Sequence, residues 1–378
     1  MKRATKRLLV ITPLAIVGIL TVGAFWVWRK MGEPLYDPGM VRTGETLRAP
    51  LSPPQQPKNS NRWRVENDIE IHHFSHGNGP PVLFIHGGPG FPMHQVPAGL
   101  QRLAAQYKIH FYDQRGCGRS TKPFEKFTSG NFYQNMLALD STLGIGAQIA
   151  DIERIRRLLA REKLVLIGHS FGGFLATLYA IEFPERVEAL VLVSPADMIV
   201  MPSKNDLFSL IRRRLPEDAL EEFGRFVKEY TDFSEVFTKS EEDLAALNRE
   251  FAKFFLRAAG RDPAEKVAEL AKAGNGGWMV TAMFFGLGRN HDYREAFRKV
   301  SVPTLIVHGD QDLVPKSVSE HYAKLLANAK LACIQQADHF LLEEKPVEFS
   351  KTIASFLKET CGNEYNQSSE FQDQREAP

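Results

Sequence analysis

Short runs of consecutive apolar residues alternate along the chain with segments in which apolar residues recur every three or four positions. We predict a strand for each apolar run, and these runs are Val82–Ile85, Lys108–Tyr112, Leu164–Ile167, Val187–Val193, Pro303–His308 and Ala329–Gln335. Helical spacing is clearest over Gln148–Ala160, where the recurring apolar residues are Ile149, Ile152, Ile155 and Leu158. Repeated β-α units whose strands are apolar throughout are typical of a parallel sheet that is covered by helices on both faces. The predicted fold class is therefore α/β, with a mostly parallel central sheet.

The alternation of strand and helix patterns is interrupted in the second half of the chain. Between about residues 197 and 292 the sequence is charged and its pattern is helical. A helical block inserted between two strands of such a sheet is most simply a cap over the end that carries the active site. The predicted division is a core over residues 62–196 and 293–360, a helical cap over residues 197–292, and a polar, disordered tail over residues 361–378.

The N-terminus differs from the rest of the chain. Residues 8–28 contain no charged residue, and a helix of about 20 residues spans the hydrocarbon core of a bilayer. Basic residues precede and follow this run, with more of them before it, which favours a cytoplasmic N-terminus. We predict a membrane anchor over residues 1–30, with a cleaved signal peptide as the alternative. In this prediction a proline-rich linker over residues 31–61 follows, and the catalytic domain lies on the extracytoplasmic side or is secreted.

Composition narrows the classes of function. The formal net charge is +2, and there is no basic stripe with interleaved aromatic residues, so we predict no nucleic-acid partner. The three cysteines are widely spaced, which indicates neither a disulfide framework nor a zinc site. The sequence also contains no Walker loop and no dinucleotide fingerprint, so we predict no metal and no cofactor. The composition leaves the oligomeric state open.

A Gly-X-Ser-X-Gly motif is the strongest chemical signal. The strand predicted over Leu164–Ile167 ends at Gly168-His169-Ser170-Phe171-Gly172, and a helical pattern follows. A strand, a sharp turn and a helix in this order form a nucleophile elbow, which holds a serine in a strained turn above the sheet. Glycines before and after the serine let the strand and the helix pack closely around the bend. Ser170 is therefore the predicted nucleophile, and we interpret His169 as a packing residue.

A serine hydroxyl needs a base to remove its proton, and the base needs a third group to orient it. Asp312 and His339 follow the last two predicted strands, in the chain order serine, acid, histidine that accompanies a nucleophile elbow. We predict that His339 is the general base and then the general acid, and that Asp312 orients its imidazole. Asp310 and Asp197 are the alternative acids.

The tetrahedral intermediate of acyl transfer needs two N–H donors for its oxyanion. One is the N–H of Phe171, the residue after the predicted nucleophile. The other is expected from the glycine-rich loop His86-Gly87-Gly88-Pro89-Gly90, which follows the first long apolar strand. Because proline has no N–H, Gly88 is the candidate.

Three stretches resemble the proline iminopeptidase (prolyl aminopeptidase) branch of the α/β-hydrolases. They are His-Gly-Gly-Pro-Gly at 86–90, Asp-Gln-Arg-Gly-Cys-Gly-Arg-Ser at 113–120 and Gly-His-Ser-Phe-Gly-Gly at 168–173. The resemblance extends from about Ile69 to Leu357 and includes the cap. It implies an α/β-hydrolase fold, the release of N-terminal residues from small peptides, and a structural role for the loop 113–120 beside the active site.

Two positions depart from this resemblance. Family members hold the free N-terminal ammonium of the substrate with cap carboxylates, but Arg289 stands before Asn290-His291 where a glutamate is expected. An arginine there would repel an amine and would suit a carboxylate or ester substrate, so we predict that Arg289 binds substrate. The elbow also reads His-Ser-Phe where the resemblance implies Gly-Ser-Trp.

The sequence therefore predicts a serine hydrolase of the proline iminopeptidase type, acting through an acyl-enzyme on a small-molecule or short-peptide substrate. The alternative is a carboxylesterase or lipase-like hydrolase of small esters or lipids. A non-catalytic binding protein on the same fold is a further alternative, because a fold does not determine a function.

Overall fold

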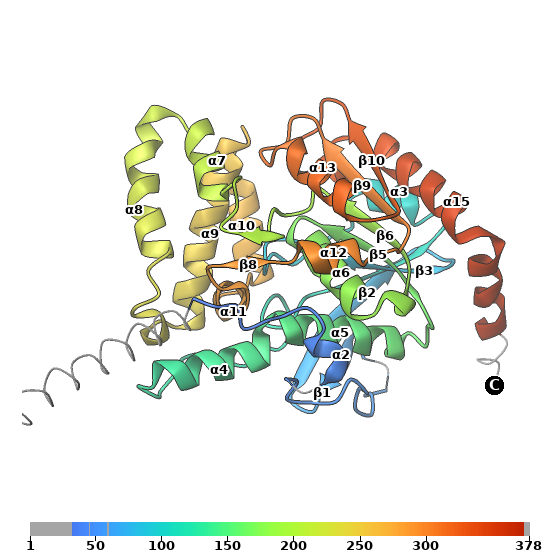
Figure 1. Cartoon of the computed structure of the whole chain (residues 1–378), viewed down its shortest axis with the longest axis horizontal. Coiled ribbons are helices and arrows are strands. Elements are labelled where there is room, and N and C mark those ends of the chain that lie inside the picture. The colour runs from blue at the N-terminus through green and yellow to red at the C-terminus, as the bar shows by residue number, and fades with distance from the viewer. Residues whose placement is uncertain (1–31, 45, 59, 374–378) are drawn as a thin grey trace, which may run out of the picture.

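A central sheet of eight strands forms the middle layer of the molecule (Figure 1). The computed structural model describes the backbone of residues 32–44, 46–58 and 60–373. Along the sheet the order is β1 (Arg62–Glu66), β2 (Ile69–His76), β4 (Lys108–Tyr112), β3 (Pro81–Ile85), β5 (Leu164–His169), β6 (Val187–Val193), β9 (Thr304–Gly309) and β10 (Ala329–Ile334). β2 is antiparallel to both of its neighbours, and the six strands from β4 to β10 are parallel. The mostly parallel sheet is as predicted.

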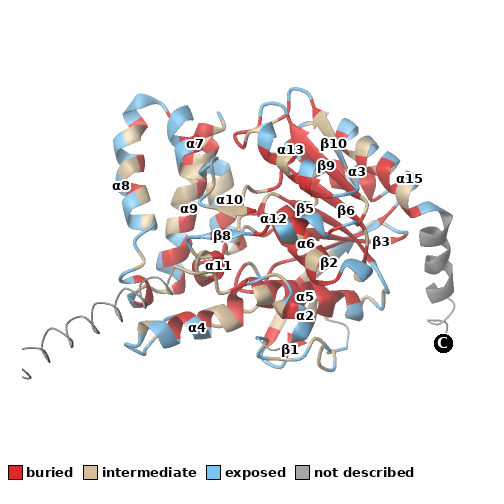
Figure 2. Ribbon diagram, viewed as in Figure 1, coloured by how far each residue is buried: buried red, intermediate tan, exposed pale blue. Residues whose placement is uncertain are grey.

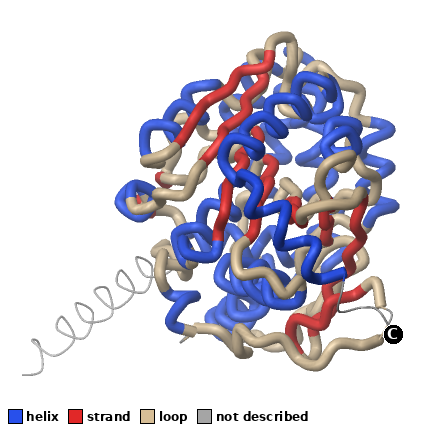
Figure 3. The backbone as a smooth tube through the Cα atoms, turned by 90° about the vertical axis from the view of Figure 1, so that its right-hand side faces the viewer, coloured by secondary structure: helices blue, strands red, loops and turns tan. Residues whose placement is uncertain are grey.

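Helices cover both faces of this sheet (Figure 3). One face packs against α3 (Ala98–Leu103), α14 (Leu341–Glu344) and the first part of α15 (Pro346–Asp373). The other face packs against α2 (Met40–Thr43), α4 (Phe132–Leu143), α5 (Ile145–Leu158), α6 (Phe171–Glu182), α12 (Arg294–Arg298) and α13 (Lys316–Leu325). Within β5, Leu164 and Leu166 belong to one apolar core and Val165 and Ile167 to the other, because successive side chains of a strand point to opposite faces. The central strands are therefore buried on both sides, as Figure 2 shows, and this explains their unbroken apolar runs.

A group of helices lies to one side of the sheet, between β6 and β9 in the chain (Figure 1). We call it the helical insertion, and it comprises α7 (Leu207–Arg214), α8 (Leu220–Tyr230), α9 (Glu241–Ala258), α10 (Ala264–Ala273) and α11 (Trp278–Leu287). Short strands β7 (Val200–Met201) and β8 (His291–Asp292) pair at its base. α9, its longest helix, starts at a capping box in which Ser240 and Asp243 exchange hydrogen bonds. Short 3₁₀ helices occur at Pro184–Arg186, Glu217–Ala219 and Val236–Thr238.

The membrane-spanning part of the predicted fold class is corrected here. The sequence predicts a membrane helix over residues 8–28, but this segment lies outside the described residues. Within the part of the chain that the structure describes, no helix is both long enough and apolar enough to cross a bilayer. What the described residues support is an α/β fold with a mostly parallel central sheet. The predicted single-pass location, and the membrane as a partner through residues 8–28, have no support in the structure.

The segment before the sheet packs against the core, although its proline content predicts a linker over residues 31–61. Tyr36 and Val41 are buried, and the Tyr36 hydroxyl donates to Glu182 at 2.9 Å. Farther along, the guanidinium of Arg154 on α5 donates to the carbonyls of Ala49 and Pro50. The apolar residues of this segment do not recur at a helix or strand spacing, so the sequence pattern does not predict that they pack against the core.

The C-terminal tail also differs from its prediction. The sequence predicts disorder over residues 361–378, whereas the backbone of α15 continues as far as Asp373. The helix is interrupted at Gly362, whose φ of 53° lies in the left-handed region that glycine tolerates. Residues 374–378 lie outside the described residues.

Candidate active site

Ser170 lies in the sharp turn between β5 and α6, with φ 55° and ψ −120°. A non-glycine residue with positive φ is strained, and such strain is characteristic of functional turns. A Cβ on Gly168 would lie 2.3 Å from the carbonyl oxygen of Gly172, and one on Gly172 would lie 2.1 Å from that of Ile85. Only glycine fits at these two positions, which is why the sequence forms the predicted elbow here.

Asp312 and His339 are neighbours at the carboxyl end of the sheet. They follow β9 and β10, adjacent parallel strands whose ends meet at the same edge. Nδ1 of His339 lies 3.0 Å from Oδ2 and 3.1 Å from Oδ1 of Asp312, and both residues are buried. The N–H of Val314 donates to Asp312 Oδ1 at 2.9 Å and helps to fix the carboxylate.

The two alternative acids are engaged elsewhere. Oδ1 of Asp310 accepts a hydrogen bond from the N–H of Ala337 at 3.3 Å. Oδ2 of Asp197 accepts from Ser203 at 2.6 Å and from Asn205 at 3.0 Å. Of the three candidate acids, Asp312 is thus the one that contacts the imidazole of His339.

The charges of this pair shift each other's titration. Burial opposes ionisation of Asp312, but the charge and hydrogen bond of His339 outweigh it and lower the pKa of the carboxyl. Burial also opposes protonation of His339, but Asp312, and then Asp338, outweigh it and raise the pKa of the imidazole above 6.5. The pair therefore favours an imidazolium beside a carboxylate, the charge state that follows proton abstraction by a histidine base.

His169 connects the elbow to the loop that carries His339. Its Nε2 lies 2.9 Å from the carbonyl oxygen of His339, and the two ring centroids are 4.9 Å apart. Burial, together with the neighbouring charge of His339, lowers the pKa of His169 to about 3, so its imidazole is neutral and can donate from Nε2 to this carbonyl. Among the hydrogen bonds of the described residues there is none between the Ser170 hydroxyl and the His339 imidazole. The described residues instead connect the elbow to the His339 loop through His169, which the sequence identifies only as a packing residue.

The glycine-rich loop passes directly beside Ser170. A Cβ on Gly87 would lie 3.0 Å from the Cβ of Ser170 and 2.9 Å from the carbonyl oxygen of His169. Gly88 follows with φ 116°, which is strained for any residue with a side chain. The N–H of Phe171 belongs to the first turn of α6, where N–H groups have no acceptor within the helix. The backbone of Gly87 thus lies close to Ser170, and a side chain at this position would crowd the elbow.

The predicted structural loop 113–120 holds the glycine-rich loop in place. The backbone N–H of Gln114 donates to Nε2 of His86 at 3.1 Å, and its side-chain amide donates to the His86 carbonyl at 2.8 Å. Burial lowers the pKa of His86, so the ring is neutral and Nδ1 can donate to the carbonyl of Gly87 at 2.9 Å. These contacts fix the residue that precedes Gly87 and Gly88.

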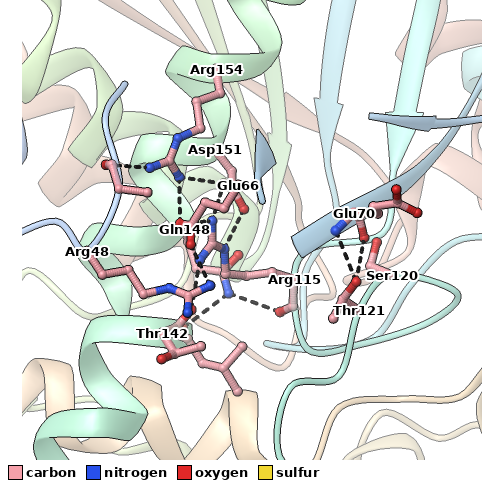
Figure 4. Close-up of polar contacts among 12 residues, drawn as sticks. Arg48, Glu66, Glu70, Arg115, Ser120, Thr121, Thr142, Gln148, Asp151 and Arg154 are labelled. Carbon is pink, nitrogen blue, oxygen red and sulfur yellow. Dashed lines mark hydrogen bonds and ion pairs between the residues drawn. The ribbon is translucent and has the colours of Figure 1, made fainter. Parts of the chain in front are cut away.

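A buried network of charges anchors the next residue of this loop, Arg115 (Figure 4). Arg115 contacts Asp151 at 2.5 Å and Glu66 at 2.8 Å, and Arg154 reaches the same Glu66 oxygen at 3.0 Å. Burial opposes ionisation of Glu66, but the two guanidinium groups outweigh it and lower the pKa of its carboxyl. The network ties the loop 113–120 to β1 and α5.

Three side chains of the helical insertion reach the loops of Asp312 and His339. Arg214 donates to the backbone carbonyl of Asp312 at 3.0 Å. The ring of Phe255 lies 5.3 Å from the imidazole of His339, edge to face. Arg261 pairs with Asp338, the residue before His339, at 2.5 Å. None of the three has a sequence signal, because a single arginine or phenylalanine in a charged, helical segment is ordinary.

Arg289 lies elsewhere. It is exposed, it follows α11, and its backbone N–H donates to the carbonyl of Gly32 at 2.8 Å. Among the described residues, none of its contacts involves Ser170, Asp312 or His339. The predicted role of Arg289 in substrate binding therefore has no support from its position. Within the described part of the chain, no group of three or more His, Cys, Asp or Glu residues is arranged to hold a metal ion.

Comparison with known proteins agrees with this architecture. Residues 80–346 match the family model described as the alpha/beta hydrolase fold, and the chain belongs to this family. The chain is 26% identical over 290 residues to the proline iminopeptidase of Heyndrickxia coagulans, across 74% of this chain and 91% of that protein. It is 28% identical over 291 residues to that of Saccharolobus solfataricus, across 74% and 86%. The resemblance inferred from the motifs is confirmed, and the protein is a proline iminopeptidase-like hydrolase of the α/β-hydrolase superfamily.

A solved structure shows the same fold. The bromoperoxidase of Bacillus anthracis superposes with a TM-score of 0.56 and 24% sequence identity, across 77% of this chain and 96% of that one. The sheet and its covering helices are therefore those of a known α/β architecture.

Proposed function

We propose that the protein is a serine hydrolase in which Ser170, His339 and Asp312 form a catalytic triad and work through an acyl-enzyme. The observation that carries the proposal is the contact of His339 Nδ1 with both carboxylate oxygens of Asp312, at 3.0 and 3.1 Å. It leaves Nε2 of the imidazole for the serine. Catalytic hydrogen bonds to a nucleophile often form only when substrate binds, so a Ser170 hydroxyl without a hydrogen bond to His339 among the described residues is compatible with this role.

The proposed reaction has two halves. The oxygen of Ser170 attacks the carbonyl carbon of the substrate while Nε2 of His339 takes the hydroxyl proton. The N–H groups of Gly88 and Phe171 stabilise the oxyanion that forms. The tetrahedral intermediate collapses, and His339 returns the proton to the leaving group. Water then attacks the acyl-enzyme by the same route, and Ser170 regains its proton.

The first candidate substrate is a small peptide with a free N-terminus. It is supported by the proline iminopeptidase relatives, which this chain matches along most of their length. Release of an N-terminal proline is therefore the first activity to test.

The second candidate substrate is a neutral ester of a small molecule or lipid. A free ammonium needs an unpaired carboxylate, and the carboxylate beside His339, Asp338, is paired with Arg261 at 2.5 Å. Phe255, the side chain of the helical insertion that lies against the His339 imidazole, is apolar. Amide and ester cleavage use the same triad, so the surroundings of the triad decide between them.

A fluorophosphonate probe tests the proposal. We expect the probe to label the wild-type protein at Ser170 and to leave Ser170→Ala unlabelled. Ser141→Ala, at a half-buried serine of α4, is the matched control and should be labelled like the wild type. A wild-type protein that takes no label and hydrolyses neither a prolyl arylamide nor an aryl ester would support a binding protein on the same fold instead.

A further inference from the structure

Three consecutive side chains after β9 lie in three different surroundings. The carboxylate of Asp312 contacts the imidazole of His339. Val314 is buried in the core on the α5 and α6 face of the sheet. Leu313, between them, is 1% exposed and is buried in the apolar core of the helical insertion. The residue that follows the candidate acid therefore packs with the insertion, although it belongs to a loop of the sheet.

The core of the helical insertion is built from α7, α8 and α9. Its most deeply buried members are Ile211, Phe223 and Phe254. Among the described residues that are buried in this core, Leu313 is the only one from outside the insertion. A buried leucine side chain makes many van der Waals contacts, so a movement of the insertion would displace Leu313 with it.

A second contact joins the insertion to the same point of the loop. Arg214, the last residue of α7, donates to the backbone carbonyl of Asp312 at 3.0 Å. Ile211 and Leu215 of the same segment belong to the core that contains Leu313. The carbonyl of Asp312 and the side chain that follows it are thus both held by the helical insertion.

The sheet holds the part of the loop that precedes the carbonyl of Asp312. The N–H of Gln311 donates to the carbonyl of Ala337 at 2.9 Å, and the N–H of Asp312 donates to that of Gly309 at 3.1 Å. These bonds fix the start of the loop at the ends of β9 and β10. They leave the direction of the chain after Asp312 to the contacts with the insertion.

The loop of His339 is anchored in a different core. Leu341 and Leu342 follow His339 and are buried on the opposite face of the sheet, beside α3 and α15. The helical insertion reaches this loop through Arg261, a partly exposed ion pair, and not through a buried side chain. The contact between Asp312 and His339 therefore joins two loops that are packed into different parts of the molecule.

We infer that Leu313 is a positioning residue, through which the helical insertion, together with the Arg214 contact, holds the Asp312 carboxylate against His339. The inference rests on the proposed function, because it concerns the alignment of the proposed triad. Since its side chain is buried within the insertion, Leu313 acts through Asp312 and not on the substrate. A displacement of about 1 Å at a catalytic group can lower the rate about 100-fold.

The test compares Leu313→Ala with Leu210→Ala in the full-length protein, with whichever substrate proves active. Leu210 is a buried leucine of α7 in the same core, so both substitutions leave a cavity there. Leu313→Ala should lower kcat about ten- to 100-fold with little change in KM. Leu210→Ala should keep kcat close to the wild-type value. Leu313→Met conserves the side-chain volume and should restore kcat.

The pH profile of kcat/KM is a readout that a loss of packing alone would not move. A histidine base works only when it is neutral, so the acid limb follows the pKa of His339. Asp312 raises this pKa, so a displaced carboxylate moves the acid limb to lower pH in Leu313→Ala, whereas Leu210→Ala keeps it in place. The other titratable or charged groups around the imidazole are the same in every variant, and they are Asp338, Arg261, His169 and His308.

A second pair of variants decides the question if urea unfolding shows that Leu313→Ala does not fold. Arg214→Ala removes the contact with the Asp312 carbonyl and should lower kcat about threefold or more, with little change in KM. Arg214→Lys keeps a charged donor and should lose less. Arg213→Ala, at the neighbouring exposed arginine of α7, is the control and should match the wild type.

Four results would overturn the inference while leaving the triad in place. They are a wild-type kcat in Leu313→Ala, equal losses in Leu313→Ala and Leu210→Ala, an acid limb that stays in place or moves to higher pH in Leu313→Ala, and equal kcat values in Arg214→Ala and Arg213→Ala. A wild-type protein with neither fluorophosphonate labelling nor turnover would instead overturn the proposed function, and the inference with it.

Discussion

Nε of Arg261 lies 2.5 Å from Oδ2 of Asp338, the residue immediately before His339. The same guanidinium pairs with Glu344 and lies 4.7 Å from the ring centroid of Phe340, the residue immediately after His339. The guanidinium of Arg261 thus contacts both residues that flank His339, the candidate base. Because these contacts form a partly buried network rather than one exposed pair, they contribute more than a typical surface ion pair.

Replacing Arg261 should change the pH dependence of the reaction. The charge of Arg261 lowers the pKa of His339, and Asp338 raises it. Arg261→Ala removes the first influence and leaves the second uncompensated, so the pKa of His339 rises. A histidine base works only when it is neutral, so the acid limb of kcat/KM moves to higher pH.

The measurement is the pH profile of kcat/KM with whichever substrate proves active. Arg261→Lys keeps the charge and should return the limb towards the wild-type position. Arg225→Ala, at an exposed arginine of α8, should leave the limb unchanged. A limb that stays in place or moves to lower pH in Arg261→Ala would contradict the assignment of His339 as the base.

Asp312→Asn should lower kcat by about 10⁴-fold, because an amide neither stabilises the imidazolium nor fixes the correct tautomer. Asp310→Asn, two residues away, should change kcat only slightly, since Asp310 contacts the N–H of Ala337 and not His339. Steady-state kinetics of the two variants provides the comparison. Equal losses in both would show that the contact seen at His339 does not determine the acid.

Arg115→Ala should lower the free energy of unfolding by at least about 2 kcal/mol, because it removes the hydrogen bonds of this guanidinium to the buried carboxylates of Asp151 and Glu66. Arg154 remains as a partner of both carboxylates. Arg225→Ala, which removes an exposed pair, should cost less than about 1 kcal/mol. Urea unfolding measures both variants.

The same network makes stability sensitive to acid. The pKa of Glu66 is lower in the folded state than its ordinary value of 4.5. The contribution of the Glu66 carboxylate to the free energy of unfolding is therefore complete above about pH 4.5, and it is lost as the pH falls through the folded-state pKa. The measurement is urea unfolding of the wild type as the pH is lowered below about 4.5. A free energy of unfolding that does not fall would contradict a charged Glu66 in the folded protein.

Asp140→Asn should stabilise the protein at neutral and alkaline pH. Asp140 lies on α4 facing α11, and burial raises the pKa of its carboxyl from 3.8 to about 7. Its folded pKa exceeds its unfolded one, so the carboxylate reduces stability progressively between these values, by at most about 4 kcal/mol. Asparagine carries no charge and avoids this penalty. Unfolding at about pH 4 should show little difference between variant and wild type, and at about pH 8 the variant should be more stable. Equal differences at both pH values would contradict the shift.

The features that could be predicted from the sequence depend on residues close together in the chain. Unbroken apolar runs identify strands that are buried on both faces, and the order of strands and helices restricts the sheet to a parallel one. The elbow is local as well. The contacts of Gly168 and Gly172 show why the motif needs glycine at each position, and steric rules over a few residues make Ser170 identifiable as the candidate nucleophile.

Other features were decided only when distant segments met. Asp310 and Asp312 follow the same strand, and only the path of two loops determines which carboxylate contacts His339. Tyr36 contacts Glu182 across 146 residues, so the proline-rich segment packs against the core although its composition predicts a linker.

The chain by itself therefore determined the class of fold, the elbow that carries the candidate nucleophile and the order of the candidate catalytic groups, because these depend on spacing and sterics within single β-α units. The tertiary structure decided the partner of His339, the contacts of Arg261 and Phe255 with the His339 loop, and the contact of Arg289 with Gly32. These features depend on the path of loops and helices in three dimensions. Contacts between segments that are far apart in the chain produce no periodic pattern of apolar residues, so the sequence alone does not predict them.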